Sequence, residues 1–177
     1  MFELSTSKDE FVSAYSNKLE VGGDAADADR NGLTLGRWSV GLFDCFGDCV
    51  PNGFMAFVCP GVSVAQIAAR LGLMRYQLAL QVDAALYLLV LLTVLADSAV
   101  VSFCCVAAAI AAAFAVSRLR TKMRALFNIP GNAVQDVASA LLCAPCAVAQ
   151  MATHAQAYQA GACSFRARST LEGYVRQ

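Results

Sequence analysis

The stretch that decides the fold is Val82 to Val116, VDAALYLLVLLTVLADSAVVSFCCVAAAIAAAFAV, whose only charged residues are Asp83 and Asp97. An apolar run of this kind indicates a membrane-spanning segment, because a helix satisfies its own backbone groups in lipid. As one helix the run would be about 52 Å long, well beyond a hydrocarbon core of about 30 Å, and Asp97 would lie near the bilayer centre. A turn at Ala96-Asp97-Ser98 removes both problems, so we predict a helical hairpin with Asp97 in its turn.

The two predicted arms, Ala84–Leu95 and Ala99–Val116, are short for complete spans. The alternative is a buried helical pair in a soluble domain. Composition favours the membrane, because the chain is 58% hydrophobic and 15% charged, whereas a globular domain is nearer half apolar and a quarter charged. The alanines at 107–109 and 111–113 would let helix backbones approach closely in lipid. The predicted fold class is therefore an all-α, small integral membrane protein with a short transmembrane hairpin and flanking Cys-rich interfacial segments.

Basic residues gather beside both outer ends of the hairpin. Arg70 and Arg75 precede the first arm. A basic cluster that we assign to the membrane interface follows the second arm: Arg118, Arg120, Lys122 and Arg124. By the positive-inside rule, both termini are expected in the cytosol. Polar, acidic sequence follows Met1, so no signal peptide is predicted, and the zero net charge argues against a nucleic-acid partner.

The chain divides into three predicted regions. Residues 1–35 form an acidic mobile tail, residues 36–158 a Cys-rich membrane domain, and residues 159–177 a C-terminal tail with little order. Within the domain, the apolar segment Phe54–Ala69 is interrupted by Cys59-Pro60-Gly61. It is therefore expected to be re-entrant or interfacial rather than spanning. After a turn at 128–132, a last helical pattern runs from Ala133 to Tyr158, and Pro145, which has no backbone N–H, is expected to open the helix.

Five cysteines outside the hairpin are candidate metal ligands. They are Cys45, Cys49, Cys59, Cys143 and Cys146. Thiolates three or four residues apart share one helical face or one tight turn, and two such pairs could complete a four-thiolate zinc site. The single histidine, His154, could be a further ligand, although a lone histidine is more often an ordinary surface or interface residue. Structural, S-acylated or redox-active thiols remain the alternatives. Cys104 and Cys105 lie inside the apolar run and are expected to be packing residues.

An ordered set of residues on both sides of the hairpin resembles the placenta-specific-eight family. That family includes cornifelin, the plant cadmium-resistance proteins and the fruit-weight cell-number regulators. The first half of the set is Trp38, Leu42-Phe43-Asp44-Cys45, Asp48-Cys49, Cys59-Pro60 and Ala65-Gln66-Ile67-Ala68. The second half is Tyr87, Leu89, Leu91, Arg120-Thr121-Lys122-Met123-Arg124, Phe127, Ile129-Pro130-Gly131, Asp136, Cys143-Ala144-Pro145-Cys146-Ala147 and Gln150.

The resemblance implies a plasma-membrane protein with a role in cell-number control, heavy-metal tolerance or ion flux. Two departures bear on the metal. The family's usual Cys-Pro-Cys is Cys59-Pro60-Gly61 here, and its paired cysteines after Cys49 are replaced by Asn52 and Gly53. If the family's cysteines handle metal, this chain has lost about half of that equipment, while the membrane scaffold is retained.

Two functions of different class follow. The first is a non-enzymatic structural or interaction component of a membrane assembly, which the lost cysteines favour. The second is a protein that binds or moves zinc or another divalent metal, acting as an oligomer, which the family favours. The expected partners are the lipid bilayer and either further copies of the chain or a larger membrane complex. No Ser/His/Asp set and no phosphate loop is present in the sequence, so an enzyme is not expected.

Overall fold

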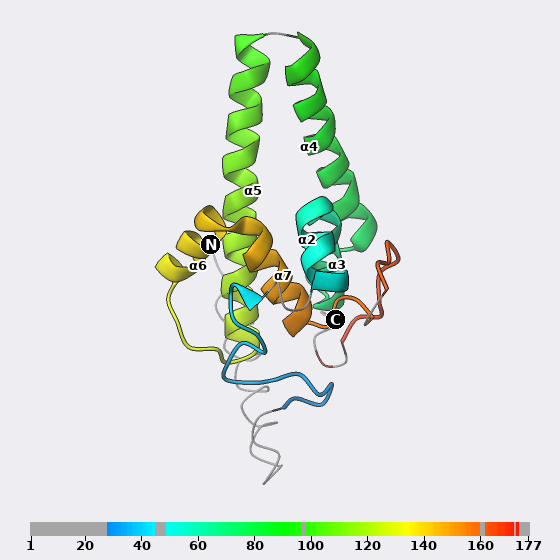
Figure 1. The fold of residues 1–177 in the computed structure, drawn as a ribbon, viewed down its shortest axis with the longest axis vertical. Helices are drawn as coiled ribbons and strands as arrows, with labels where there is room; N and C mark the ends of the chain where they lie inside the picture. Colours follow the sequence, from blue (N-terminus) through cyan, green and yellow to red (C-terminus); the bar gives the residue numbers. More distant parts are fainter. Residues whose placement is uncertain (1–27, 45–48, 97, 160–161, 172, 174–177) are drawn as a thin grey trace, which may run out of the picture.

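The computed structural model describes residues 28–44, 49–96, 98–159, 162–171 and 173, and within these residues it is helical with two isolated β-bridges. A short helical segment, η2 (Cys49–Gly53), leads into α2 (Phe54–Val58) and α3 (Pro60–Arg70). The two long helices follow, α4 (Tyr76–Ala96) and α5 (Ala99–Leu126), and then α6 (Ala133–Leu142) and α7 (Ala144–His154). Figure 1 shows α4 and α5 projecting together from one end of a body formed by the shorter helices.

The long helices confirm the predicted hairpin. They contain 21 and 28 residues, or about 31 and 42 Å at 1.5 Å per residue, enough to cross a hydrocarbon core of about 30 Å. No residue of either helix's most apolar 18-residue window is buried. The break falls between Ala96 and Ala99 as expected, while Asp97 lies outside the described residues. The helices are longer than the predicted arms because each continues past the apolar run into the body, where it packs on the short helices.

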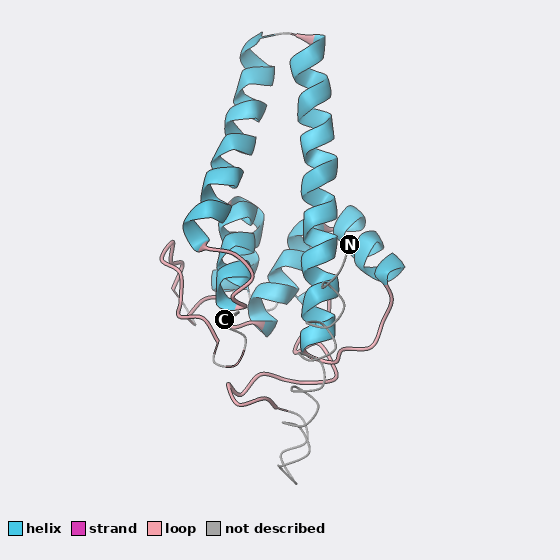
Figure 2. Cartoon of the chain, turned by 180° about the vertical axis from the view of Figure 1, so that it is seen from behind, coloured by secondary structure: helices cyan, strands magenta, loops and turns pink. Residues whose placement is uncertain are grey.

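The shorter helices surround the foot of the hairpin (Figure 2). One hydrophobic core of buried side chains lies in this body. Its largest fully buried side chains come from elements far apart in the sequence, among them Met55 of α2, Ile67 of α3, Met123 of α5 and Met151 of α7. The C-terminal end of α5, around Met123, is therefore part of a packed domain. Among the described residues, the N-terminal part of α5, from Ala99, has only α4 as a neighbour. This difference separates the membrane-facing part of the fold from its body.

Two bent helix pairs flank the hairpin, and each bends at a cysteine. The α2–α3 pair breaks at Cys59 (φ −133°, ψ 65°), directly before Pro60. The α6–α7 pair breaks at Cys143 (φ −151°, ψ 79°) and bends by 117°. The helical pattern expected from Ala133 to Tyr158 is therefore two helices, and the opening expected at Pro145 is present as the break at Cys143. Pro145 has no backbone N–H and its ring clashes with the carbonyl four residues earlier, so a straight helix cannot pass through this point.

The packed body extends beyond residues 36–158 at both ends. Leu33 and Leu171 are only 2% and 3% exposed and belong to the core. The backbone N–H of Leu171 donates to the carbonyl of Arg70, and the Gln66 side chain donates to the carbonyl of Ser164. The expectation of little order after residue 159 is therefore wrong for residues 162–171, because single apolar anchors fasten this otherwise polar stretch. The predicted acidic tail up to residue 27 lies outside the described residues.

Candidate functional site

The predicted metal ligands Cys143 and Cys146 form a disulfide, with their Cα atoms 5.3 Å apart. Cys143 is half-buried at the bend and Cys146, in the first turn of α7, is 5% exposed. Residues three apart in a first helical turn lie on the same face, so this pairing follows from the local sequence. Both sulfurs would have to be reduced before they could bind a metal ion as thiolates.

The structure does not show the other three predicted ligands beside the Cys143–Cys146 disulfide. Cys59 is a free, half-buried thiol at the α2–α3 bend. Cys49 begins η2, which packs against α7, but its side chain is not described, and Cys45 lies outside the described residues. Across the described part of the chain, no three His, Cys, Asp or Glu side chains gather as a metal site. A site that includes Cys45 and Cys49 stays a prediction.

His154 lies in the core rather than at a surface. Its side chain is 1% exposed, and its Nδ1 accepts a hydrogen bond from the backbone N–H of Ser39 at 3.2 Å. The imidazole makes edge contacts with the rings of Trp38 and Phe127, with centroids 5.2 and 4.6 Å away. Burial lowers the pKa of His154 to about 4, partly offset by the charge of Asp29. The ring is therefore neutral at physiological pH, and Nδ1 is already engaged.

Gln150 lies one turn before His154 on α7 and contacts the same segment. Its side-chain amide donates to the carbonyl of Val40 at 2.7 Å. Together Gln150 and His154 fasten residues 38–40 to the buried face of α7. Trp38 and Gln150 were identified by the family resemblance without a physical role. The structure shows that both belong to the contact between residues 38–40 and α7.

The predicted basic cluster divides into a buried half and an exposed half. Asp136 of α6, 1% exposed, receives hydrogen bonds from Nε and Nη2 of Arg124 at 2.9 and 2.6 Å. Arg120 lies 3.3 Å from the same carboxylate as an ion pair, and its guanidinium is 4.3 Å from the centroid of the Trp38 ring. These two arginines therefore bind α6 to the foot of α5 rather than facing a membrane surface.

Arg118 and Lys122 are the members of the cluster that remain outside. Both are exposed on α5, and Arg118 lies over the ring of Phe114, 4.8 Å from its centroid. They are free to face lipid headgroups, as predicted for the whole cluster. Asp136 was not predicted from the sequence as the partner of Arg120 and Arg124. The available signal was a lone acid in the first turn of an otherwise apolar helix.

Asp83, the first charge of the apolar run, lies against the start of α3. A Cβ atom on Gly61 would overlap its carboxylate, so the second residue of α3 must be a glycine while Asp83 keeps this position. The site where the family usually has a second cysteine is thus filled by a carboxylate from α4.

The fold and these contacts define a class of protein: an integral membrane protein whose helical hairpin stands on a small body of Cys-bent helix pairs. The PLAC8 family model matches residues 38–154, about two thirds of the chain. The chain belongs to the PLAC8 family. The matched range begins at Trp38 and ends at His154, two side chains in contact with each other.

Two relatives in plants are each similar to about two thirds of the chain. Cell number regulator 4 of Zea mays is 32% identical over 118 residues, which cover 66% of this chain and 64% of the relative. Protein PLANT CADMIUM RESISTANCE 2 of Arabidopsis thaliana is 34% identical over 115 residues, covering 65% of this chain and 64% of the relative. The match thus spans less than two thirds of each relative's length. No solved structure matches the chain significantly.

Proposed function

We propose that this protein is a non-enzymatic structural component of a membrane protein assembly, in which the hairpin contacts other transmembrane helices. The observation that carries the proposal is the outward face of α5. Ala107 and Ala111 are exposed there, one turn apart, beside the large side chain of Ile110, which is 67% exposed. Small residues on a lipid-facing helix allow a second helix to approach closely, and packing of this kind drives association in lipid.

The orientation that we propose places the body and both termini in the cytosol, at the plasma membrane. Arg70 and Arg75 at the foot of α4 support it, together with the exposed Arg118 and Lys122 at the foot of α5. Basic residues next to the ends of short hairpins favour the cytosolic side. The plasma membrane is the usual location implied by the family.

The assembly proposal is tested by the size of the particle extracted from its native membrane. The protein is isolated in polymer-bounded native discs, cross-linked and measured by mass photometry and mass spectrometry. We expect an assembly larger than one chain for the native sequence, and a smaller one for Ala107→Leu/Ala111→Leu. Val100→Leu on the same helix is the matched control, since Val100 is 72% exposed and already large. A single chain in every sample contradicts the proposal.

A second candidate function is binding or transport of zinc or another divalent metal by an oligomer. Two observations favour it: a relative is named for cadmium resistance, and the sulfurs of Cys143 and Cys146 lie together at the start of α7, against which η2 packs. Once reduced, this pair offers two soft ligands on one side of a helix. Because the thiols must lose their protons, binding should weaken at acidic pH.

The metal content of reduced, purified protein tests this second function. Three double variants are compared with the native chain: Cys143→Ser/Cys146→Ser, Cys45→Ser/Cys59→Ser, and Cys104→Ser/Cys105→Ser. The last pair lies in α5 within the apolar span and is the control. If Cys143 and Cys146 bind the metal ion, Cys143→Ser/Cys146→Ser loses it and Cys104→Ser/Cys105→Ser retains it. Near-zero metal in every sample rejects the function.

A further inference from the structure

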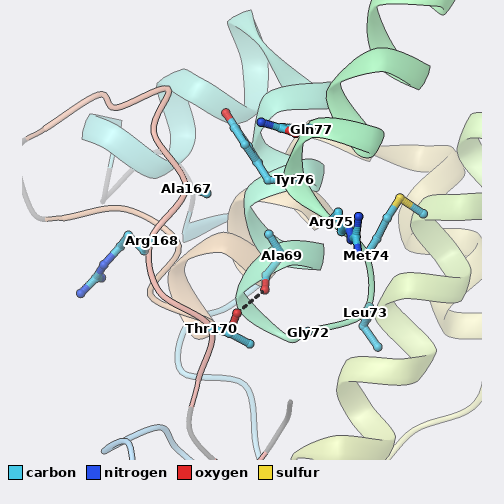
Figure 3. Close-up of a pocket in the computed structure, with 10 residues that line it drawn as sticks. All are labelled: Ala69, Gly72, Leu73, Met74, Arg75, Tyr76, Gln77, Ala167, Arg168 and Thr170. Carbon is cyan, nitrogen blue, oxygen red and sulfur yellow. Dashed lines mark hydrogen bonds between the residues drawn. The ribbon is translucent and has the colours of Figure 1, made fainter. Parts of the chain in front are cut away.

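A cavity of about 580 Å³ opens at the foot of α4, between the α3–α4 turn and the C-terminal segment 167–170 (Figure 3). Gly72, Leu73, Met74 and Arg75 line it from the turn, and Arg168 belongs to the opposite wall. The hydroxyl of Thr170 donates to the carbonyl of Ala69 at 3.3 Å and fastens the C-terminal segment to α3. The volume is in the range of small-molecule sites.

The cavity lies at the depth of the lipid headgroups if α4 crosses the membrane. From the turn end at Ala96 down to Tyr76 the helix has 21 residues, or about 31 Å, so Tyr76 lies near the edge of the hydrocarbon core. Counting the same length along α5 from Ala99 ends next to Arg118. Leu73 and Met74, 37% and 45% exposed, shortly precede Tyr76 and so lie at headgroup depth, while Tyr76 and Gln77 line the cavity from α4.

The surroundings of the cavity are positively charged without compensation by a described acid. Arg75 and Arg168 line the cavity, and Arg70 and Arg166 lie next to these two segments in the sequence. Unlike Arg120 and Arg124, none of them forms an ion pair with a carboxylate of the described residues. Arg70 donates to the carbonyls of Ala155 and Ser169 instead. Burial and then the charge of Arg168 lower the pKa of Arg70, as expected for like charges held close together.

We propose that this cavity binds the phosphate group of an anionic membrane lipid, with Arg75 as its direct contact. Arginine suits this role because its planar guanidinium can donate two parallel hydrogen bonds to a phosphate. In Figure 3 the Arg168 guanidinium points away from the cavity, and its Nη1 donates to the carbonyl of Gln156 at 2.7 Å. Arg168 therefore contributes its charge rather than a contact. The lipid is favoured over a soluble anion because Tyr76 and Gln77, the first two residues of the membrane-spanning α4, line the cavity.

Arg75→Gln is the variant that tests the proposal, since Arg75 is exposed and its loss leaves the core unchanged. Lys122→Gln is the matched control, because it removes one exposed positive charge from the foot of the other arm. Purified full-length protein in phosphatidylcholine nanodiscs is titrated with short-chain phosphatidylglycerol. Binding is followed by native mass spectrometry and by the rise in unfolding temperature. Phosphatidylcholine of the same chain length and inorganic phosphate are titrated in parallel.

We expect phosphatidylglycerol to bind the native chain and the Lys122→Gln control with equal affinity. Arg75→Gln should bind it about tenfold or more weakly, because it removes the charge-assisted hydrogen bonds to the phosphate. An equal loss in both variants means diffuse attraction to a basic surface and overturns the site. Equal binding of phosphatidylcholine overturns the preference for an anionic lipid. An equal effect of inorganic phosphate overturns the lipid as the source of the phosphate.

Discussion

Asp136 on α6 accepts hydrogen bonds from both Nε and Nη2 of Arg124 on α5, and its carboxylate is almost completely buried. The hydroxyl of Thr121 donates to the same carboxylate at 2.8 Å. A buried charge is stable only when it is paired and hydrogen-bonded. This one carboxylate therefore fixes how the second bent helix pair sits on the hairpin.

Asp136→Asn should destabilise the protein by about 3–5 kcal/mol, because two arginines would be left in a buried site without a counter-charge. Thermal unfolding in detergent, followed by circular dichroism, measures the loss. Lys122→Gln, on the exposed side of α5, should change stability by less than about 0.5 kcal/mol. If both variants unfold at the same temperature, the ion-pair network contributes nothing to the fold.

The contact between Gly61 and Asp83 predicts a coupling between two positions on different helices. Gly61→Ala alone should destabilise the chain by about 1–3 kcal/mol, because the new methyl group displaces the carboxylate. In an Asp83→Ala background the same change should be neutral or slightly stabilising, since alanine favours a helix more than glycine does. A double-mutant cycle on unfolding free energy gives the coupling. Additive effects would show that the two residues do not touch.

His154 should make the protein less stable as the pH falls towards 5.5. Its pKa is about 4 in the folded chain, against an ordinary 6.5, so the unfolded chain binds the proton more tightly. The stabilisation is complete above about pH 6.5 and is lost towards pH 4. It falls by about 1.4 kcal/mol between pH 7.5 and 5.5 and by about 3 kcal/mol in all.

Unfolding midpoints at pH 7.5, 6.5 and 5.5 check this dependence. His154→Gln should start from a lower midpoint at pH 7.5 but change little with pH over the same interval. The chain has a single histidine, so no other imidazole can produce the effect. A native chain that is as stable at pH 5.5 as at pH 7.5 would mean that His154 is accessible to protonation.

The hairpin and the bend at Cys59 were predictable because each depends on local sequence alone. The length of the apolar run and the single acid at position 97 predict the hairpin. The sequence Cys59-Pro60 predicts the bend between α2 and α3. The bend at Cys143 was within reach as well, since Pro145 forbids a straight helix. The position and the angle of the bend were not, because the apolar pattern on both sides of Pro145 indicates helix without fixing how the two helices lie.

The roles of Asp136 and His154 could not be predicted from local pattern. Arg120 and Arg124 follow an apolar span and match an interfacial basic cluster, and only the fold reveals the acid that neutralises them. His154 is surrounded by Trp38 and Phe127, residues 116 and 27 positions away in the sequence. The burial of His154 results from tertiary packing, which cannot be predicted from helical periodicity.

The account depends most on the hairpin crossing the membrane twice, with the body on one side. Three small epitopes test this directly: one at each end of the chain and one inserted after Ser98, between α4 and α5. Their protease protection is compared in sealed and permeabilised vesicles. We predict that the two terminal epitopes share one side, which we propose to be cytosolic, and that the Ser98 epitope lies on the other. Terminal epitopes on opposite sides, or all three on one side, would contradict the hairpin.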